Sequence, residues 1–198
     1  MKKIDILTDN DFETFFDRQG LFTRNQLEEH LKLYNGYVER SNEYMYRYNS
    51  AKSGLALIGV KERFYIKNKE TYDLDSLILH DLFIENLANP NQQENYMPEK
   101  LCGIFEESFG TVNNWGIDFK EAAKLSKGWA LFVYEPLSDT YRNIILESHN
   151  EGIIIGAKIL LVFDAYEHAY FIDFGANKKE YIEKFMQNIN WEVVEGRL

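Results

Sequence analysis

Hydrophobic positions in the first half of the chain recur at helical spacing over long stretches. From Arg24 to about Ser53 the sequence contains no proline and one glycine. The apolar positions that follow the helical period there are Leu27, Leu31, Tyr34, Tyr37 and Val38. Thr23 fits an N-cap with Gln26 as its capping-box partner, and a second helix fits Leu74 to Leu87. Two long helices joined by a loop predict an antiparallel helical hairpin.

Beyond Pro98 the pattern becomes mixed. Two helices are predicted, over Glu99 to Phe109 and Val112 to Ser126, separated by Gly110. Three candidate strands follow, at Trp129 to Tyr134, Tyr141 to Glu147 and Lys158 to Phe163, with a turn at Pro136 to Asp139. A helix over Lys178 to Asn188 and a short terminal one end the chain. The expected fold is α+β: an N-terminal antiparallel helical hairpin followed by an α/β domain with a three-stranded antiparallel sheet.

Three interruptions of the pattern divide the chain. Residues 1–22 read as an irregular arm with a short aromatic cluster, and Gly54 to Gly59 separates the two long helices. The segment Asn89-Pro90-Asn91 ends the second helix and is the best candidate for a domain boundary. We therefore expect a helical hairpin domain over residues 1–90 and a C-terminal α/β domain over residues 91–198.

Composition limits the classes of partner. With 198 residues, 45% of them hydrophobic, the chain can bury one large or two small cores. A net charge of −10 argues against general nucleic-acid binding, and no apolar window approaches the about 18 residues of a membrane span. Cys102 is the single cysteine, which excludes an internal disulfide and fits a reducing compartment. Acidic residues interrupt the start of the chain, so we expect no signal peptide and a cytoplasmic protein with no nucleic-acid or membrane partner.

The strongest chemical signal lies near the end of the third predicted strand. An apolar run from Ile159 to Phe163 stops at Asp164, and His168 follows four residues later. At this spacing the two side chains point the same way at the turn into a helix. A carboxylate and an imidazole that converge there make half of a transition-metal site, although the same spacing is common in exposed surface pairs.

The surrounding residues resemble the C-terminal signature of the iron/manganese superoxide dismutases. That family reads Asp-x-Trp-Glu-His-Ala-Tyr-Tyr, then Arg-Pro-Asp-Tyr, then Val-Asn-Trp, and this chain has DAYEHAYF, NKKEY and NINWEVVEGRL. The resemblance implies that Asp164 and His168 are both metal ligands. His80, in LILHDLFIENLANP, matches the histidine of the family's Asn-His-x-x-Phe-Trp-x-x-Leu and would be a third ligand. Phe83 and Leu87 stand at the positions of that pattern's Phe and Leu.

The fourth ligand is ambiguous in the sequence. The family has a ligand histidine eight residues before a gateway tyrosine in a Tyr-Val pair. Here Tyr37 and Val38 match, but Glu29 stands eight residues before Tyr37 and His30 seven. A one-residue π-bulge would favour Glu29, and a plain α-helix would favour His30. We favour His30, because imidazole suits iron and manganese.

The same resemblance implies the reaction. A mononuclear iron or manganese ion, one per chain, would disproportionate superoxide to dioxygen and hydrogen peroxide. Tyr37 would be the gateway phenol, and His149 would take the place of the family's Gln or His that contacts the metal-bound solvent and tunes the redox potential. Lys178 occupies the place of the family's funnel arginine, where it would keep the positive charge that attracts an anion.

Dimerisation and divergence follow from the same comparison. Glu167 matches the glutamate that bonds the ligand histidine of the other subunit, so a homodimer through Glu167 and His168 is expected. The family's second gateway histidine is replaced by Leu33 or Tyr34, and its usual partner tyrosine is Phe171 here. These departures leave an alternative: a weakly active or non-catalytic, superoxide-dismutase-like protein that binds metal or serves a structural role. The retained histidines favour the enzyme.

Overall fold

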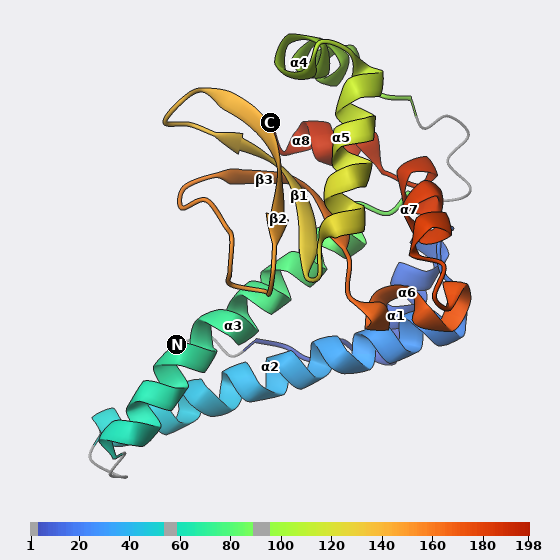
Figure 1. The fold of residues 1–198 in the computed structure, drawn as a ribbon. Coiled ribbons are helices and arrows are strands. Elements are labelled where there is room, and N and C mark those ends of the chain that lie inside the picture. Colours follow the sequence, from blue (N-terminus) through green and yellow to red (C-terminus); the bar gives the residue numbers. More distant parts are fainter. Residues whose placement is uncertain (1–3, 54–58, 89–95) are drawn as a thin grey trace.

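Two long antiparallel helices form the first part of the molecule and project from a compact α/β body (Figure 1). The computed structural model describes residues 4–53, 59–88 and 96–198. The helices are α1 Asp9–Arg18, α2 Arg24–Lys52, α3 Val60–Glu85, α4 Glu99–Phe109, α5 Val112–Leu125, α6 Glu167–Phe174, α7 Lys178–Gln187 and α8 Trp191–Gly196. The strands are β1 Trp129–Glu135, β2 Thr140–Leu146 and β3 Lys158–Asp164. This order confirms the predicted fold class.

Two predicted elements differ from the structure. The arm over residues 1–22 contains helix α1, which begins at a capping box in which Thr8 accepts a hydrogen bond from Asp11 N and the Asp11 carboxylate accepts one from Thr8 N. Helix α3 begins at Val60 rather than at Leu74. Its early turns are rich in charged residues and carry few apolar ones, of which only Ile66 is buried, so the hydrophobic pattern did not reveal them. Segments that lack an apolar stripe still form helix when no residue breaks it.

The loop from Gly54 to Ile58 and the boundary segment Asn89-Pro90-Asn91 lie outside the described residues. None of the helices in the described part of the chain is both long and apolar enough to cross a bilayer.

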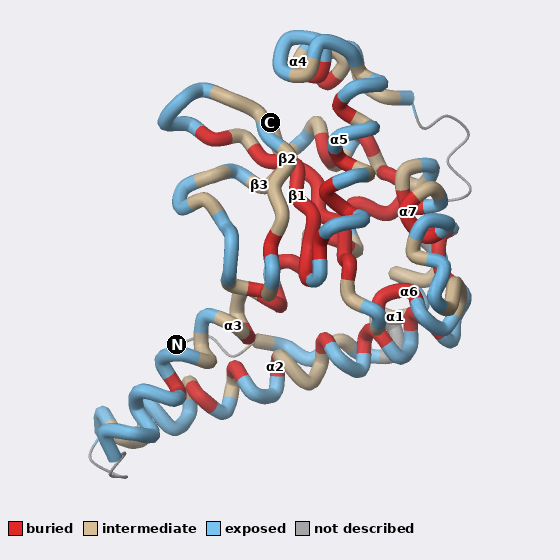
Figure 2. Tube along the Cα trace, in the orientation of Figure 1, coloured by how far each residue is buried: buried red, intermediate tan, exposed pale blue. Residues whose placement is uncertain are grey.

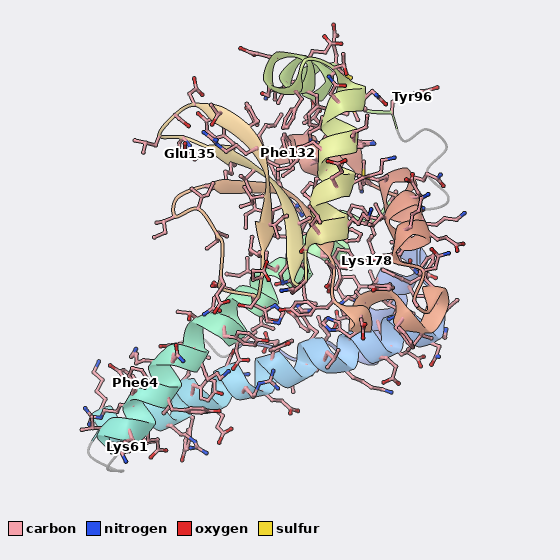
Figure 3. All side chains as sticks on the ribbon, in the orientation of Figure 1. Lys61, Phe64, Tyr96, Phe132, Glu135 and Lys178 are labelled. Atoms are coloured by element: carbon pink, nitrogen blue, oxygen red, sulfur yellow. The ribbon has the colours of Figure 1, made fainter. Side chains whose placement is uncertain are left out.

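The sheet has the order β2-β1-β3 and is antiparallel throughout. Its central strand, β1, is almost wholly buried, as Figure 2 shows. The Phe132 ring points from β1 towards α4 and α5 (Figure 3), where it lies 5.1 Å from the Phe105 ring and 5.8 Å from the Trp115 ring. Aromatic packing of this kind supplies much of the apolar area that stabilises the C-terminal body.

The register of the sheet brings three strand ends to one edge. Trp129, the first residue of β1, lies opposite both Leu146 at the end of β2 and Asp164 at the end of β3. Gly128 precedes this point, and a Cβ there would lie 2.7 Å from the Leu146 carbonyl oxygen. Glycine is required by this close approach of the two chain segments.

Arg197, the C-cap of α8, ties this helix to α3 and β3. Its guanidinium donates to the Asn86 side chain at 2.6 Å, to the Leu160 carbonyl at 3.0 Å and to the Leu82 carbonyl at 3.1 Å. It also pairs with Glu85 at 2.8 Å. Since α3 and β3 both carry residues of the site described below, this side chain helps to fix their relative position.

Replacing Arg197 with alanine is expected to lower the free energy of unfolding by about 2–4 kcal/mol, because several acceptors lose their charged donor at once. Denaturant unfolding measures the loss. Arg47→Ala is the matched control: this arginine pairs with Glu43 and Glu62 in solvent and should cost at most about 1 kcal/mol. Equal losses for the two variants would contradict a special role for Arg197.

Candidate metal centre

Four side chains converge between the helical hairpin and the sheet edge. They are His30, His80, Asp164 and His168, and each offers one ligand atom within 4.8 Å of the others. The Nε2 atoms of the three histidines lie 3.1, 3.7 and 3.3 Å from Asp164 Oδ2, in that order. Atoms that share one first-row metal ion at about 2.1 Å are about 3–4 Å apart. The spacing therefore suits a single ion.

Each of the four comes from a different element. His30 lies in the second turn of α2, and His80 lies near the end of α3. Asp164 ends β3, and His168 follows in the first turn of α6. The strand-to-helix turn brings the last two together as their spacing predicts, whereas the first two arrive through the packing of the hairpin.

The chemistry of the donor atoms fits a metal ion. Among the described residues, the buried atoms that make no hydrogen bond include His30 Nε2, His80 Nε2, Asp164 Oδ2 and His168 Nε2. Buried polar groups are nearly always paired, so four unpaired donor or acceptor atoms that face one point require another partner. Three imidazoles and one carboxylate form a ligand set that suits iron or manganese.

Neighbouring groups leave the correct atom of two ligands free. His80 Nδ1 lies 2.6 Å from the Ser76 carbonyl oxygen and therefore donates its proton there, which leaves the lone pair on Nε2. Tyr166 N donates to Asp164 Oδ1 at 3.0 Å, so that Oδ2 remains available. Contacts of this kind orient metal ligands and fix the histidine tautomer.

Burial and mutual charge set the protonation of the cluster. Burial lowers the pKa of His30 and, with His30 as a neighbour, lowers the pKa of His80 to about 3. Burial alone would raise the pKa of Asp164 and lower that of His168. Their mutual attraction reverses both shifts: the pKa of Asp164 lies well below its usual range, and that of His168 lies above. At neutral pH the carboxylate is thus ionised and the imidazoles of His30 and His80 are neutral, and an ion bound there would displace the proton that the raised pKa favours on His168.

The structure brings His30 rather than Glu29 to the cluster. Helix α2 is regular through this region, so that His30 and Tyr37, seven residues apart, lie on the same face. Glu29 faces solvent and pairs with Lys32. With His30 in the cluster, Tyr34 lies one turn further along that face and is buried, while Leu33 is exposed. Burial and the nearby Asp81 raise the pKa of Tyr34 well above its usual value.

Tyr37 and His149 lie beside the cluster and are joined to Trp129 in one chain of hydrogen bonds. The Tyr37 hydroxyl lies 2.9 Å from His149 Nε2, and Trp129 Nε1 donates to His149 Nδ1 at 3.0 Å. An indole N–H is a donor only, so Nδ1 accepts and the neutral imidazole carries its proton on Nε2. His149 therefore donates to the Tyr37 oxygen, so the Tyr37 proton is directed to an acceptor other than His149, and the Ser76 side chain is a second hydrogen-bonding neighbour of the phenol.

Burial keeps this chain uncharged. It lowers the pKa of His149 to about 4 and, together with the neighbouring Tyr72, raises the pKa of Tyr37 to about 12. The sheet register explains why the chain forms: Trp129 lies opposite Leu146, and His149 follows three residues later, in the loop after β2.

The remaining predicted residues lie around the cluster. Lys178, at the start of α7 (Figure 3), donates to the Ser126 carbonyl at 2.6 Å, and burial lowers its pKa although Asp164 partly offsets the effect. Glu167 is exposed next to His168, and the Phe171 side chain on the same helix is 54% exposed.

Sequence reasoning missed Ser76 and gave Gln26 a different role. Ser76 acts through its backbone carbonyl, which no side-chain pattern reveals. Gln26 was expected to complete a capping box with Thr23, yet its side chain bonds to α6 instead.

Comparison with known proteins gives consistent results. The family described as iron/manganese superoxide dismutases, C-terminal domain, matches residues 97–197. A protein of Aquifex aeolicus named superoxide dismutase (Fe) is 32% identical over 88% of this chain and 83% of its own length. One of Pyrobaculum aerophilum, also named superoxide dismutase (Fe), is 29% identical over 85% and 80%. One of Haloferax volcanii named superoxide dismutase (Mn) 2 is 31% identical over 64% and 63%.

Proposed function

The chain belongs to the iron/manganese superoxide dismutase family, and we infer that it disproportionates superoxide to dioxygen and hydrogen peroxide. The observation that carries this inference is the convergence of three imidazole nitrogens on Asp164 Oδ2, where these buried atoms have no hydrogen-bond partner. A purely structural core would be more stable with apolar residues in their place.

We propose His30, His80, Asp164 and His168 as the ligands of one iron or manganese ion. When bound, the ion would supply the one-electron redox chemistry that superoxide disproportionation needs. The chain's own contribution is to hold four donors in place and to keep bulk water out: His30, His80 and Asp164 are at most 2% exposed. The Ser76 carbonyl and the Tyr166 amide keep the ligand atoms of His80 and Asp164 oriented.

We propose Tyr37 and His149 as the groups that move and hold protons. Because His149 donates to the Tyr37 oxygen, the phenol proton is directed away from His149 and is available to a substrate oxygen. The imidazole then stabilises the phenol oxygen as it gives up that proton, and Trp129 holds the imidazole in one tautomer.

Lys178 is proposed to supply local positive charge in a chain whose net charge is −10. Its ammonium group is half-buried at the Ser126 carbonyl and close enough to Asp164 for its pKa to respond to that carboxylate. A fixed cation near the site would raise the local concentration of a small anion.

The division of the chain at residue 90 gives each proposed domain two ligands. His30 and His80 come from residues 1–90, and Asp164 and His168 come from residues 91–198, so the site would join the two domains. We propose a cytoplasmic location because the single cysteine fits a reducing compartment. We propose an antioxidant role because the reaction would remove superoxide.

We further propose a homodimer in which Glu167 bonds His168 of the partner subunit. The exposure of Glu167 and of the neighbouring Phe171 supports this. Glu167→Ala should weaken the dimer, with a rise of about tenfold or more in the dissociation constant measured by sedimentation, because a charge-assisted hydrogen bond is lost on each side of the twofold axis. Glu192→Ala, in α8 and away from α6, is the control. An unchanged dimer in both variants would contradict the proposed bridge.

The deciding experiment is the rate of superoxide consumption per bound metal atom, on protein loaded separately with iron and with manganese. A rate far above that of the free ion, with one of the two metals or both, is expected. One metal bound per chain without such a rate would overturn the proposed activity while leaving the metal site in place.

A further inference from the structure

We propose that Gln26 is a positioning residue that fixes the distance between the two halves of the metal site. The inference rests on the proposed ligand set, since Gln26 itself makes no contact with a ligand side chain. Its effect would be exerted through the backbone of His168, which its carboxamide contacts.

The Gln26 carboxamide joins α2 to α6 through two hydrogen bonds. Its Nε2 donates to the His168 carbonyl at 2.7 Å, and its Oε1 accepts from Ile172 N at 3.0 Å. In a regular α-helix the amide of residue 172 donates to the carbonyl of residue 168. Gln26 therefore bonds both members of one such backbone pair in α6, the helix that presents the His168 side chain.

Gln26 and His30 stand on the same face of α2. They are four residues apart, which places one side chain directly above the other. The face that delivers the His30 imidazole to the cluster thus also holds the backbone of His168, and the two imidazole centroids lie 5.2 Å apart. A fixed carboxamide between α2 and α6 sets this spacing more tightly than apolar packing alone, because hydrogen bonds are directional.

A second contact between the same helices frees Gln26 for this role. Thr23, the N-cap of α2, donates from its backbone N–H and its hydroxyl to the Asp173 carboxylate at 2.7 and 2.5 Å. In a capping box the side chain of the third helical residue accepts a hydrogen bond from the backbone N–H of the N-cap residue. Here the Asp173 carboxylate of α6 accepts that bond instead. Gln26 has no cap to complete and is 0% exposed, whereas the Asp173 contact is open to solvent.

Gln26→Leu removes both bonds and keeps a side chain of similar volume. Outer-shell partners of metal ligands change metal affinity by about 10–100-fold. We therefore expect at least a tenfold rise in the dissociation constant for Mn(II), together with a changed Mn(II) electron paramagnetic resonance spectrum, since the spectrum reports ligand geometry. Gln26→Met, which is unbranched and flexible, should give the same shifts and serves if the leucine variant folds poorly.

Gln19→Leu is the matched control. Gln19 is likewise buried and bonds the Phe22 carbonyl and the amides of Leu21 and Phe22, all within the loop before α2. Both substitutions should lower the melting temperature, but only those at Gln26 should change the affinity and the spectrum. Equal Mn(II) affinities for the Gln26 and Gln19 variants would overturn the positioning role. A wild-type chain that bound neither Mn(II) nor Fe(II) would overturn the ligand set, and this inference with it.

Discussion

Replacing His30 with alanine is expected to abolish stoichiometric binding of iron or manganese. The substitution removes one of the three imidazoles that face Asp164 and opens the buried site beside it. The loss in affinity should exceed the about 10–100-fold that the removal of an outer-shell partner costs. Metal content after exhaustive dialysis, measured per folded chain, is the direct test.

Glu29→Ala separates the two possible registers of α2. Glu29 faces solvent and pairs with Lys32, so its removal should leave metal content unchanged and stability within about 1 kcal/mol of the wild type. Loss of metal in the Glu29 variant and its retention in the His30 variant would refute the proposed ligand set and would require a bulge in α2.

Replacing His149 with leucine should lower the turnover number for superoxide by about 10²–10⁴-fold, the range over which a positioned acid–base group contributes. The metal should remain bound, because His149 is not one of the four clustered ligands. The reason for the loss is geometric: without an N–H at 2.9 Å, the Tyr37 oxygen has no donor to stabilise it when its proton leaves.

Trp129→Phe tests the same chain one step further out. It removes the indole N–H that holds His149 Nδ1 as an acceptor, so the imidazole is free to change tautomer and the fall in turnover should be smaller than that of His149→Leu. Both variants are compared at equal metal content. Full activity in His149→Leu would refute the proposed proton chain, and a larger loss in Trp129→Phe would mean that the indole acts mainly through packing.

Patterns of short range in the sequence predicted much of this fold correctly. The sequence pattern gave α2, α4 and α5 nearly to the residue, and the turn predicted at Pro136 to Asp139 separates the first two strands. Strand ends and an i, i+4 spacing predicted that Asp164 and His168 would meet, because one turn of chain joins them. These features depend on neighbouring residues alone.

Hydrophobic periodicity missed two helical segments for local reasons. The early turns of α3 lack an apolar stripe, and α1 begins at a capping box within an arm that has no strong period. The role of Gln26 was misread because the sequence offered a local partner, Thr23, whereas the folded chain supplied Asp173 and the α6 backbone from almost 150 residues away. Local reasoning cannot weigh a partner that only folding brings close.

The sequence by itself determined the fold class, the residue types that make up the candidate metal site and the resemblance to a family. It left the register of α2 open, because Glu29 and His30 are adjacent and both types of side chain bind metals. The tertiary structure decided that point: a regular α2 packed against α3 and α6 directs His30 inward and Glu29 to solvent. The direction of a side chain on a long helix is set by the whole helix and its neighbours, and not by the residue that carries it.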